Sequence, residues 1–579
     1  LIGIVLAGLV LFVFLRSLPL TLIAVAAIPL TVAIVGLALG VTGQTINLMT
    51  LAGIAGAIGL VADDAIVVSE NIERQHALGE AGRATDPVDR GVRDLLPALI
   101  GSSLSTTVIL VPFALLAGIV GAFFKPLALT MALALIVSFA VAVLVVPVAI
   151  GRLGFGRRGA GGGAARPPSR FLRGYDRLVA ACIRRGGLTA ATLAGGIVVM
   201  LVFYRTIGTD FLPAMDEGAI ILDYWTPPGT ALTDTDAMLA EAEKIILATP
   251  DVTNYSRRTG AQLGFFITEP NRGDYVITLK PRGARRDIEV VMDDLRARIQ
   301  AAEPAIHTDF GQLLEDDIGD LTGGVPQPID VKVFGADPSL LAATARQIAR
   351  ILDSVPGVED VFDGIVIAGP ALDIRVDPAA AARYRLSTTD IHAAVEPAVT
   401  GTVVDQVRVG DRMYDLRIFT RHAGPLGDLP VRAATLPGAL LPLSALATVG
   451  TGAPEAEIDR ENLRTFVGVT ARLSGRDLGG AVAEIRRRIE REVRLGSGMS
   501  VEYGGQYQQQ QDSFRGLFFV LLGSLLLVSL VVLFEFGDWR APLVTSVCAI
   551  AVLAGVLLAL MLTGQTLNSF PLSLILFEL

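Results

Sequence analysis

The stretch GLVADDAIVVSENIER, residues 59–74, places Asp63 and Asp64 directly after 46 residues without a charged side chain. One helix needs about 20 apolar residues to cross a bilayer, so this uncharged run predicts two membrane-spanning helices. The turn between them is expected at GVTGQT, residues 40–45. The second helix is expected to continue through both aspartates to about Glu70.

Other uncharged runs predict further membrane helices. They cover residues 1–15, 95–124, 126–151, 186–204, 516–534 and 541–577. With the two helices above they give eight helices, the first of them abbreviated, and the start of a ninth. The predicted fold is an α-helical polytopic membrane bundle into which a large α+β domain is inserted. The predicted domains are first-bundle helices at 1–151, an arginine-rich loop at 152–185, one helix at 186–204, the inserted aqueous domain at 205–515, and truncated second-bundle helices at 516–579.

Composition supports this division. The chain has 579 residues, of which 52% are apolar and 18% charged, and its mean hydropathy is +0.57. Residues 205–515 hold 45 of the 57 acidic and 32 of the 48 basic residues. This pattern excludes both a single water-soluble globule and a disordered chain. Residues 152–185 carry nine arginines against one acidic residue, which predicts that they are cytoplasmic and that 205–515 lie on the opposite side.

The aqueous domain is predicted to mix helices and strands. Residues 237–256 and 343–362 each combine an amphipathic helix, a proline-centred turn and a strand, at an offset of 106 residues. Alternating segments at 218–224, 275–279 and 329–334 predict further strands. Ferredoxin-like β-α-β repeats are therefore the expected content of this domain.

Residue usage excludes several kinds of chemistry. The two cysteines cannot build a disulfide framework, and four scattered histidines give no basis for a zinc hydrolase. None of the four lysines follows a glycine, so the phosphate-binding loop of many ATPases is missing. A net charge of −9 argues against nucleic-acid partners. The sequence predicts no resident metal site.

The paired aspartates are the main functional candidates. A charge at membrane depth costs at least ~2.5 kcal/mol on insertion scales and usually marks an ion pathway. Two adjacent carboxylates resist simultaneous ionisation, so one of Asp63 and Asp64 is expected to bind and release a proton near neutral pH. Gly53, Gly56 and Gly59 precede them at a spacing that lets another helix approach closely. The next helix offers further hydrogen-bonding groups through the hydroxyls of Ser102, Ser103, Ser105, Thr106 and Thr107.

Other interpretations of the acidic pair stay open. The pair lies close to a helix end, so its side chains could extend to the headgroups or serve packing alone. The protein would then be a membrane-embedded scaffold. An intramembrane aspartyl protease would need a Gly-x-Gly-Asp motif, which residues 59–64 do not match.

Two motifs occur twice in the chain. LFVF at 11–14 recurs as LFEF at 533–536, and TGQTIN at 42–47 recurs as TGQTLN at 563–568. Two copies of one helical bundle are common in secondary transporters. By this repeat, the counterpart of the aspartate pair would fall beyond the last residue. The chain is therefore expected to be an internal piece of a longer protein and not to transport on its own.

Residues 59–74, the paired TGQT turns and FLPAMDEG at 211–218 resemble the resistance-nodulation-division (RND) family of efflux permeases. The resemblance covers essentially the whole chain. It implies a proton-driven antiporter, not an enzyme, in the bacterial inner membrane with a large periplasmic domain. It also implies a homotrimer in the lipid bilayer, a periplasmic adaptor protein, an outer-membrane channel and no cofactor besides the proton gradient. Asp63 and Asp64 match the family's proton-relay pair, and Glu70 matches a further carboxylate of its metal-exporting branch.

The resemblance also implies where substrate binds. Residues 205–515 look most similar to the metal-exporting branch, whose copper and silver exporters use three methionines and a glutamate. The corresponding residues here are Asp223, Arg272, Asp320 and Asp274. Because no thioether remains, monovalent copper and silver are not expected as substrates.

The expected substrates are organic or amphiphilic compounds, with Phe265, Phe266, Tyr224 and Trp225 lining an apolar pocket unless they are ordinary sheet core. One alternative is export of divalent heavy-metal cations by the three aspartates. Another is a relative with the same fold that acts in lipid handling or protein translocation.

Overall fold

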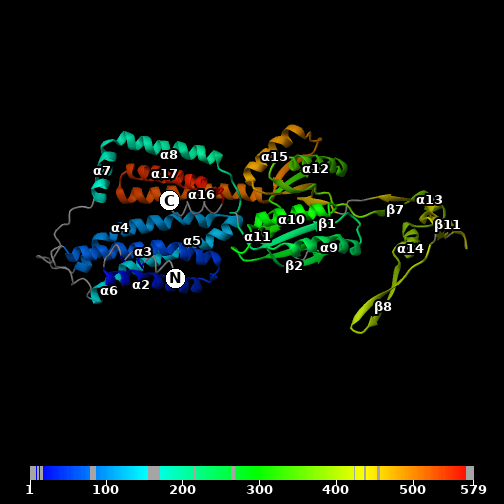
Figure 1. Ribbon diagram of the computed structural model, residues 1–579, viewed down its shortest axis with the longest axis horizontal. Helices are drawn as coiled ribbons and strands as arrows, with labels where there is room; N and C mark the ends of the chain where they lie inside the picture. The colour runs from blue at the N-terminus through cyan, green and yellow to red at the C-terminus, as the bar shows by residue number, and fades with distance from the viewer. Residues whose placement is uncertain are drawn as a thin grey trace.

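A helical bundle occupies one end of the computed structural model, and a mixed α/β domain occupies the other (Figure 1). The structure describes residues 8–9, 12, 17–77, 87–153, 170–213, 215–262, 268–422, 424–433, 435, 438–452 and 457–568. The expected first helix at 1–15, residues 154–169 of the arginine-rich loop and the expected ninth helix fall largely or wholly outside these residues.

Seven apolar helical segments of the described chain form the bundle. They are α2 (Leu18–Val41), α3 (Leu48–Ala77), α4 (Pro87–Ile109), α5 (Gly118–Ala140) with its continuation α6 (Val146–Leu153), α8 (Gly186–Thr206), α16 (Gly505–Phe536) and α17 (Arg540–Leu562). Six of these segments are long and apolar enough to cross a membrane, and α8 contributes a shorter apolar stretch. The expected turn after α2 is confirmed. Asn47 begins α3 by accepting hydrogen bonds from the backbone N–H groups of Met49 and Thr50, each at 3.0 Å.

Two local expectations in the membrane region were wrong. The helix expected at 95–124 already ends at Ile109, where a short 3₁₀ turn, Val111–Leu115, contains Pro112. Gly118 then starts α5 with a φ of +66°, a conformation that favours glycine, so Lys125 lies inside a helix rather than between two. The arginine-rich loop also contains a helix, α7 (Arg170–Arg184).

The first ferredoxin-like unit spans residues 219–312. Its elements are β1 (Ala219–Trp225), α9 (Leu232–Ala248), β2 (Val252–Thr259), β3 (Arg272–Leu279), α10 (Ile288–Ala302) and β4 (His307–Gln312). The sheet order is β2-β3-β1-β4, and all neighbours are antiparallel. Ile220, Leu222 and Tyr224 of β1 pack against α9 and α10 in a buried core. Since side chains alternate along a strand, Asp223 and Trp225 lie on the opposite face.

The second ferredoxin-like unit repeats this plan around an insertion. It contains β5 (Ile329–Phe334), α12 (Pro338–Asp353), β6 (Val358–Phe362), β14 (Arg464–Leu473), α15 (Leu478–Glu492) and β15 (Ser500–Gly504), in the sheet order β6-β14-β5-β15. The short strand β13 (Asp459–Glu461) extends the sheet beside β14. The pairs α9–β2 and α12–β6 are the two sequence repeats at an offset of 106, so the predicted ferredoxin-like content is confirmed.

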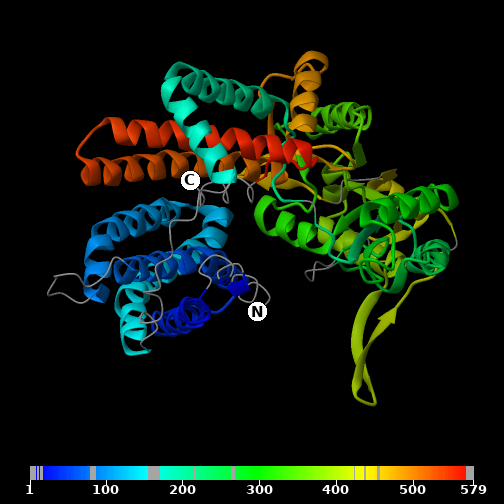
Figure 2. The ribbon, with the colours of Figure 1, turned by 60° about the vertical axis from the view of Figure 1, so that its left-hand side comes forward.

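The insertion lies between β6 and β14 and forms a separate small body. Its elements are β7 (Ala371–Val376), α13 (Pro378–Arg383), α14 (Thr388–Val399), β8 (Thr402–Val409), β9 (Arg412–Ile418), β10 (Pro430–Arg432), β11 (Leu440–Pro442) and β12 (Ala447–Gly452). The β8–β9 hairpin projects far from the rest of the chain in both views (Figures 1 and 2). Every residue of its two strands is exposed except Thr402, which is half-buried at the start of β8.

Candidate functional site: membrane carboxylates and an acidic cavity

The helix α3 packs closely against α5 near the aspartate pair. A Cβ built on Gly53 would lie 2.8 Å from the Leu127 carbonyl oxygen of α5, and one on Gly56 would lie 3.8 Å from the Met131 side chain. Gly59 has no such neighbour within 4 Å. The predicted close approach is therefore confirmed at the first two glycines and not at the third.

Asp64 meets α5 through Ser138, a residue that the sequence analysis missed. The Ser138 hydroxyl lies 3.5 Å from Asp64 Oδ2 and 3.2 Å from the Val61 carbonyl oxygen. Of the α4 hydroxyls, Ser102 donates to the Leu99 carbonyl oxygen and Thr106 to the Ser102 carbonyl oxygen within their own helix, and the buried Ser103 hydroxyl has no hydrogen-bond partner among the described residues. The available signal was that 126–151 contains only two hydroxyl residues, of which Ser138 is one.

The other two membrane candidates are more open than Asp64. Asp63 and Glu70 are exposed on the surface of α3, whereas Asp64 is half-buried. A further carboxylate, Glu535 of the repeated LFEF motif, packs against α4, where a Cβ on Gly101 would lie 2.5 Å from it. The structure thus spreads the membrane carboxylates over two helices, α3 and α16.

A cavity of about 730 Å³, here called the acidic cavity, lies between the polar faces of the two ferredoxin-like units. Its charged lining residues are Asp223, Glu269, Arg272, Asp274, Asp316, Asp320, Asp330, Lys332, Glu457, Asp459, Arg460 and Glu461. The four charged residues predicted to contact substrate, Asp223, Arg272, Asp274 and Asp320, are among them. Phe265 and Phe266 fall outside the described residues.

Aromatic side chains close part of the cavity wall. Trp225 stacks on Phe362 of the second unit, with ring centroids 5.7 Å apart and an interplanar angle of 13°. Phe466 also lines the cavity. Tyr224 points the other way, into the core of the first unit, where it packs against Tyr275. Of these two neighbouring aromatic residues, Trp225 therefore lines the cavity, whereas Tyr224 is sheet core.

Three aspartates lie in a row across the first sheet. Asp223 of β1 pairs in register with Asp274 of β3 on one side and with Asp309 of β4 on the other. Arg258 holds Asp274 by two hydrogen bonds, of 2.7 and 2.6 Å. For Asp223, in contrast, the described residues provide no ion pair. Burial, followed by the charges of neighbouring carboxylates, raises the pKa of Asp223 well above its usual range.

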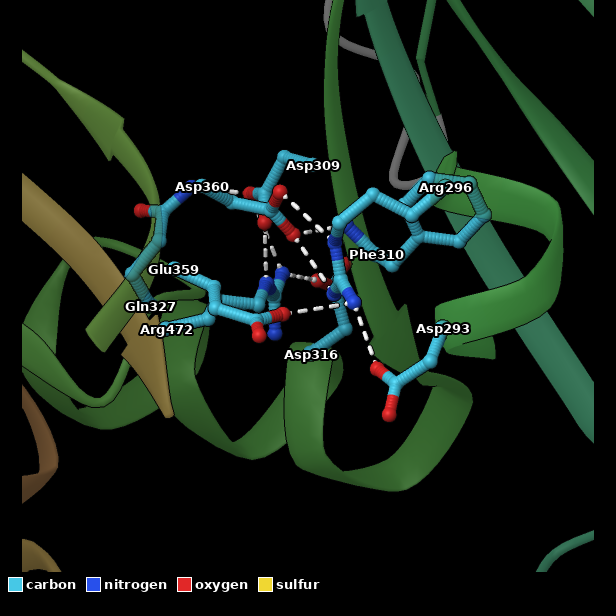
Figure 3. A network of polar contacts seen from close by, with 9 residues as sticks. All are labelled: Asp293, Arg296, Asp309, Phe310, Asp316, Gln327, Glu359, Asp360 and Arg472. Carbon is cyan, nitrogen blue, oxygen red and sulfur yellow. Dashed lines mark hydrogen bonds and ion pairs between the residues drawn. The ribbon is translucent and has the colours of Figure 1, made fainter. Parts of the chain in front are cut away.

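A network of buried ion pairs joins the two units behind the cavity (Figure 3). Arg472 of β14 binds Asp309 of β4, and its guanidinium lies 2.8 Å from Asp316 Oδ1 of α11 (Leu313–Gly323). Gln327 donates to Asp309 Oδ2 at 2.5 Å. Burial raises the pKa of Asp316 to about 6, although Arg472 opposes this rise.

A second arginine completes the network from the first unit. Arg296 of α10 binds Asp360 of β6 by two hydrogen bonds of 2.9 Å, and it lies 2.6 Å from Glu359 and 2.7 Å from Asp293. Each arginine therefore bridges a helix or strand of one unit to a strand of the other. Buried ion pairs of this kind fix the relative positions of the two units but add little net folding stability, because the cost of removing the charges from water offsets their attraction.

The carboxylates of the cavity do not form a closed metal cluster. Within the described residues, no group of three His, Cys, Asp or Glu side chains lies close enough together to hold a metal ion. The cavity instead distributes nine carboxylates and three basic side chains over its wall.

Comparison with known proteins places these features in a family. The AcrB/AcrD/AcrF family model matches residues 1–573. The cobalt-zinc-cadmium resistance protein CzcA of Cupriavidus metallidurans is 28% identical over 97% of this chain and 54% of its own length, and the nickel and cobalt resistance protein CnrA of the same organism gives the same values. The cation efflux system protein CusA of Escherichia coli K12 is 26% identical over 84% of this chain and 48% of its own. A crystal structure of a heavy metal efflux pump covers 99% of this chain and 56% of its own, with a TM-score of 0.83 and 27% identity. The chain therefore spans about half the length of the curated relatives that it matches.

Proposed function

The chain belongs to the AcrB/AcrD/AcrF family, the RND permeases, and from this premise we propose that it is the part of a proton-driven efflux permease that conducts cations through the acidic cavity. The observation that carries the proposal is the charge of the cavity wall, with nine carboxylates against three basic side chains. Such a wall attracts cations and repels anions.

Divalent metal cations are the proposed substrates. The relatives named above are described by resistance to cobalt, zinc, cadmium and nickel or by cation efflux. Their names favour the metal alternative over the organic or amphiphilic compounds expected from the sequence. The cavity fits hard or borderline cations, because Asp223 and Asp320 offer oxygen ligands and no methionine lines the cavity among the described residues.

Organic cations are a second candidate. The stacked pair of Trp225 and Phe362, together with Phe466, gives the acidic cavity an aromatic wall. Aromatic faces attract organic cations as well as apolar groups. A cavity of about 730 Å³ also exceeds the space that a metal ion needs.

Protons are the proposed driving ions. Asp63 and Asp64 would carry them, because two adjacent carboxylates in an apolar helix alternate readily between charged and neutral states. Ser138 would position Asp64 through their contact, and Glu70 would serve as a further carboxylate on the same helix. The protein would then act as a secondary transporter and not as an enzyme.

The proposed location is the bacterial inner membrane, with the ferredoxin-like units in the periplasm. The long apolar helices identify a membrane protein. Arginines around α7 favour a cytoplasmic position for that helix. A periplasmic adaptor and an outer-membrane channel would complete the export route, as the family membership implies.

The β8–β9 hairpin supports a homotrimer as the working assembly. Its exposed apolar side chains include Val404, Val407, Val409, Met413, Tyr414, Leu416 and Ile418. A two-stranded hairpin with apolar groups on both faces is only marginally stable alone. Insertion into a neighbouring protomer would bury these groups.

The decisive test compares metal and drug resistance in a pump-deficient bacterial host. The longest gene product that contains this sequence is expressed as wild type, Asp63→Asn, Asp64→Asn, Asp223→Asn and the exposed control Asp353→Asn. Protection against zinc, cobalt or cadmium salts is expected for wild type and control, and loss of protection for the other three. Protection against cationic drugs alone would replace metals by the second candidate, and equal resistance in all variants would contradict proton-driven cation export.

A further inference from the structure

Asp330 of β5 is a buried carboxylate on the second unit's side of the acidic cavity. It is 2% exposed and lines the cavity, and neither of its carboxylate oxygens has a hydrogen-bond partner among the described residues. Buried polar groups are nearly always hydrogen-bonded, because an unsatisfied one costs free energy. The position of Asp330 therefore requires an explanation other than packing.

Two glycines on the neighbouring strands leave room for this carboxylate. A Cβ built on Gly468 of β14 would lie 2.9 Å from Asp330 Oδ1, and one on Gly504 of β15 would lie 3.0 Å from Oδ2. These strands flank β5 on its two sides. Any larger residue at either position would displace the carboxylate, so the space around Asp330 is defined on both sides.

The nearest cation is the ammonium of Lys332, two residues further along β5 and hence on the same sheet face. Its Nζ lies 3.7 Å from Asp330 Oδ2 and 2.8 Å from Glu461 Oε2 of β13. It also lies 5.4 Å from the ring centroid of Phe466. Lys332 is one of only four lysines in a chain with 44 arginines. Unlike a guanidinium, an ammonium is a compact point charge, and it is the side-chain group most similar to a bound metal ion.

We propose that Asp330 and Glu461 form a second cation-binding subsite in the acidic cavity, which the ammonium of Lys332 fills until a divalent metal cation displaces it. This inference rests on the proposed function, because it takes the divalent cation from there. Two carboxylates from two strands would provide part of the coordination shell, and water would complete it. Such a site binds weakly and reversibly, as a transport path requires.

The charges around Asp330 agree with this role. Lys332 faces it from its own strand, Glu461 and Asp459 approach from β13, and the cross-strand neighbours on β14 and β15, Thr470 and Gly504, are uncharged. Burial raises the pKa of Asp330 to about 7, while Lys332 opposes the rise and Glu461 adds to it. A cation close to this carboxyl group therefore favours its ionised form near neutral pH.

The two tryptophans of the chain provide a direct binding assay. Trp225 lines the acidic cavity, and Trp539 lies at the start of α17. In a Trp539→Phe background, the remaining fluorescence reports on the cavity, and Co²⁺ quenches it on binding. The purified full chain is titrated with CoCl₂ in this background without further change and with Asp330→Asn, Glu461→Gln, Lys332→Met, Asp223→Asn, the double variant Asp330→Asn/Lys332→Met, or the exposed control Asp353→Asn.

The two single variants at Lys332 and Asp330 and their double variant form a double-mutant cycle for Co²⁺ affinity. Lys332→Met raises the apparent Co²⁺ affinity on the order of tenfold, because it removes the competing ammonium, while Asp330→Asn and Glu461→Gln each lower it by a similar factor. The double variant loses the gain. Glu461 is exposed, so its variant keeps the test valid if Asp330→Asn does not fold.

Two other outcomes separate the inference from the proposed function. Unchanged affinity in Lys332→Met and Glu461→Gln, with loss of binding only in Asp223→Asn, would overturn the subsite and leave metal export standing. No Co²⁺ quenching in any variant, Lys332→Met included, would contradict metal export itself and with it the subsite.

Discussion

Asp223 and Asp274 are direct partners across the β1–β3 pairing, yet among the described residues an arginine binds only Asp274 of the two. Arg258 neutralises Asp274 from the neighbouring strand β2, whereas Asp223 faces the cavity between further carboxylates. Two carboxylates at adjacent positions of one sheet thus differ in how their charge is neutralised. Asp274 is satisfied within the protein, and Asp223 is the carboxylate of this pair that a substrate cation would neutralise.

Replacing Asp223 by asparagine is expected to lower cation affinity on the order of tenfold without loss of thermal stability. The change removes a buried carboxyl group that burial and neighbouring charges already disfavour in its ionised form. The measurement is Co²⁺ titration and thermal unfolding of the purified protein, with Asp353→Asn as control. A drop in stability with unchanged affinity would assign Asp223 a structural role.

Replacing Arg472 by glutamine is expected to destabilise the junction between the two units by about 3–5 kcal/mol, because Asp309 and Asp316 would stay buried without their cation. Limited proteolysis and thermal unfolding measure the effect. The exposed Arg486→Gln is the matched control. Partial recovery in the triple variant Arg472→Gln/Asp309→Asn/Asp316→Asn would identify the uncompensated charge as the cause, and no recovery would point to lost packing.

Replacing Ser138 by alanine is expected to slow proton-coupled transport up to about tenfold, whereas Asp64→Asn abolishes it. The alanine variant removes one hydrogen bond to a carboxylate, worth roughly 0.5–1.5 kcal/mol, but keeps the titrating group. Uptake into inside-out vesicles under an imposed pH gradient separates the two outcomes. Thr130→Ala, on the same helix but bonded to its own backbone, is the control. Equal loss in both alanine variants would argue for a packing defect in α5.

Cation binding at the second subsite is expected to strengthen as pH rises from about 6 to about 8. The pKa of Asp330 lies at about 7, so the carboxyl group is mostly protonated below this value and cannot attract a cation. As the pH rises, the Asp330 carboxyl group loses its proton and becomes the carboxylate that binds the cation. The fluorescence titration described above, repeated across this range, should show the trend in wild type and a flatter profile in Asp330→Asn. The same profile in both proteins would exclude Asp330 as the titrating group.

Polar substitution on the hairpin is expected to reduce trimer formation. Tyr414→Asp and Val404→Asp place charges on side chains that are exposed in the single chain and would be buried in a neighbour. Native mass spectrometry or cross-linking in membranes gives the assembly state. Thr448→Asp, on the insertion but outside the hairpin, is the control. An unchanged trimer would show that the hairpin has another partner.

Much of the membrane bundle could be predicted because charge is so costly in a bilayer that its absence alone marks a helix. The same criterion caused the error at Lys125. An uncharged run cannot show where a helix stops, and the break between α4 and α5 depends on Pro112 and the positive φ of Gly118. The helix α7 was missed because its arginines were used only for orientation, although their spacing also indicates an amphipathic helix.

The acidic cavity could be predicted only in part. Asp223, Arg272, Asp274 and Asp320 were found by resemblance, and the structure gathers them in one cavity. Arg472 was not found, because it is 163 residues from Asp309 in sequence and no local pattern connects them. Ser138 was missed for a similar reason, since the rotation of α5 decides which of its two hydroxyls faces Asp64.

The insertion between β6 and β14 has a consequence for biosynthesis. The first unit is continuous from residue 219 to 312, so all of its strands are available soon after they emerge. Within the described residues of the second unit, β5 pairs only with β14 and β15, and β6 pairs only with β14, and both β14 and β15 follow the insertion. The segment β5–α12–β6 therefore lacks its partner strands, and its apolar side chains stay exposed, until more than a hundred further residues have been synthesised. Chaperones and proteases would first encounter the nascent protein during this interval.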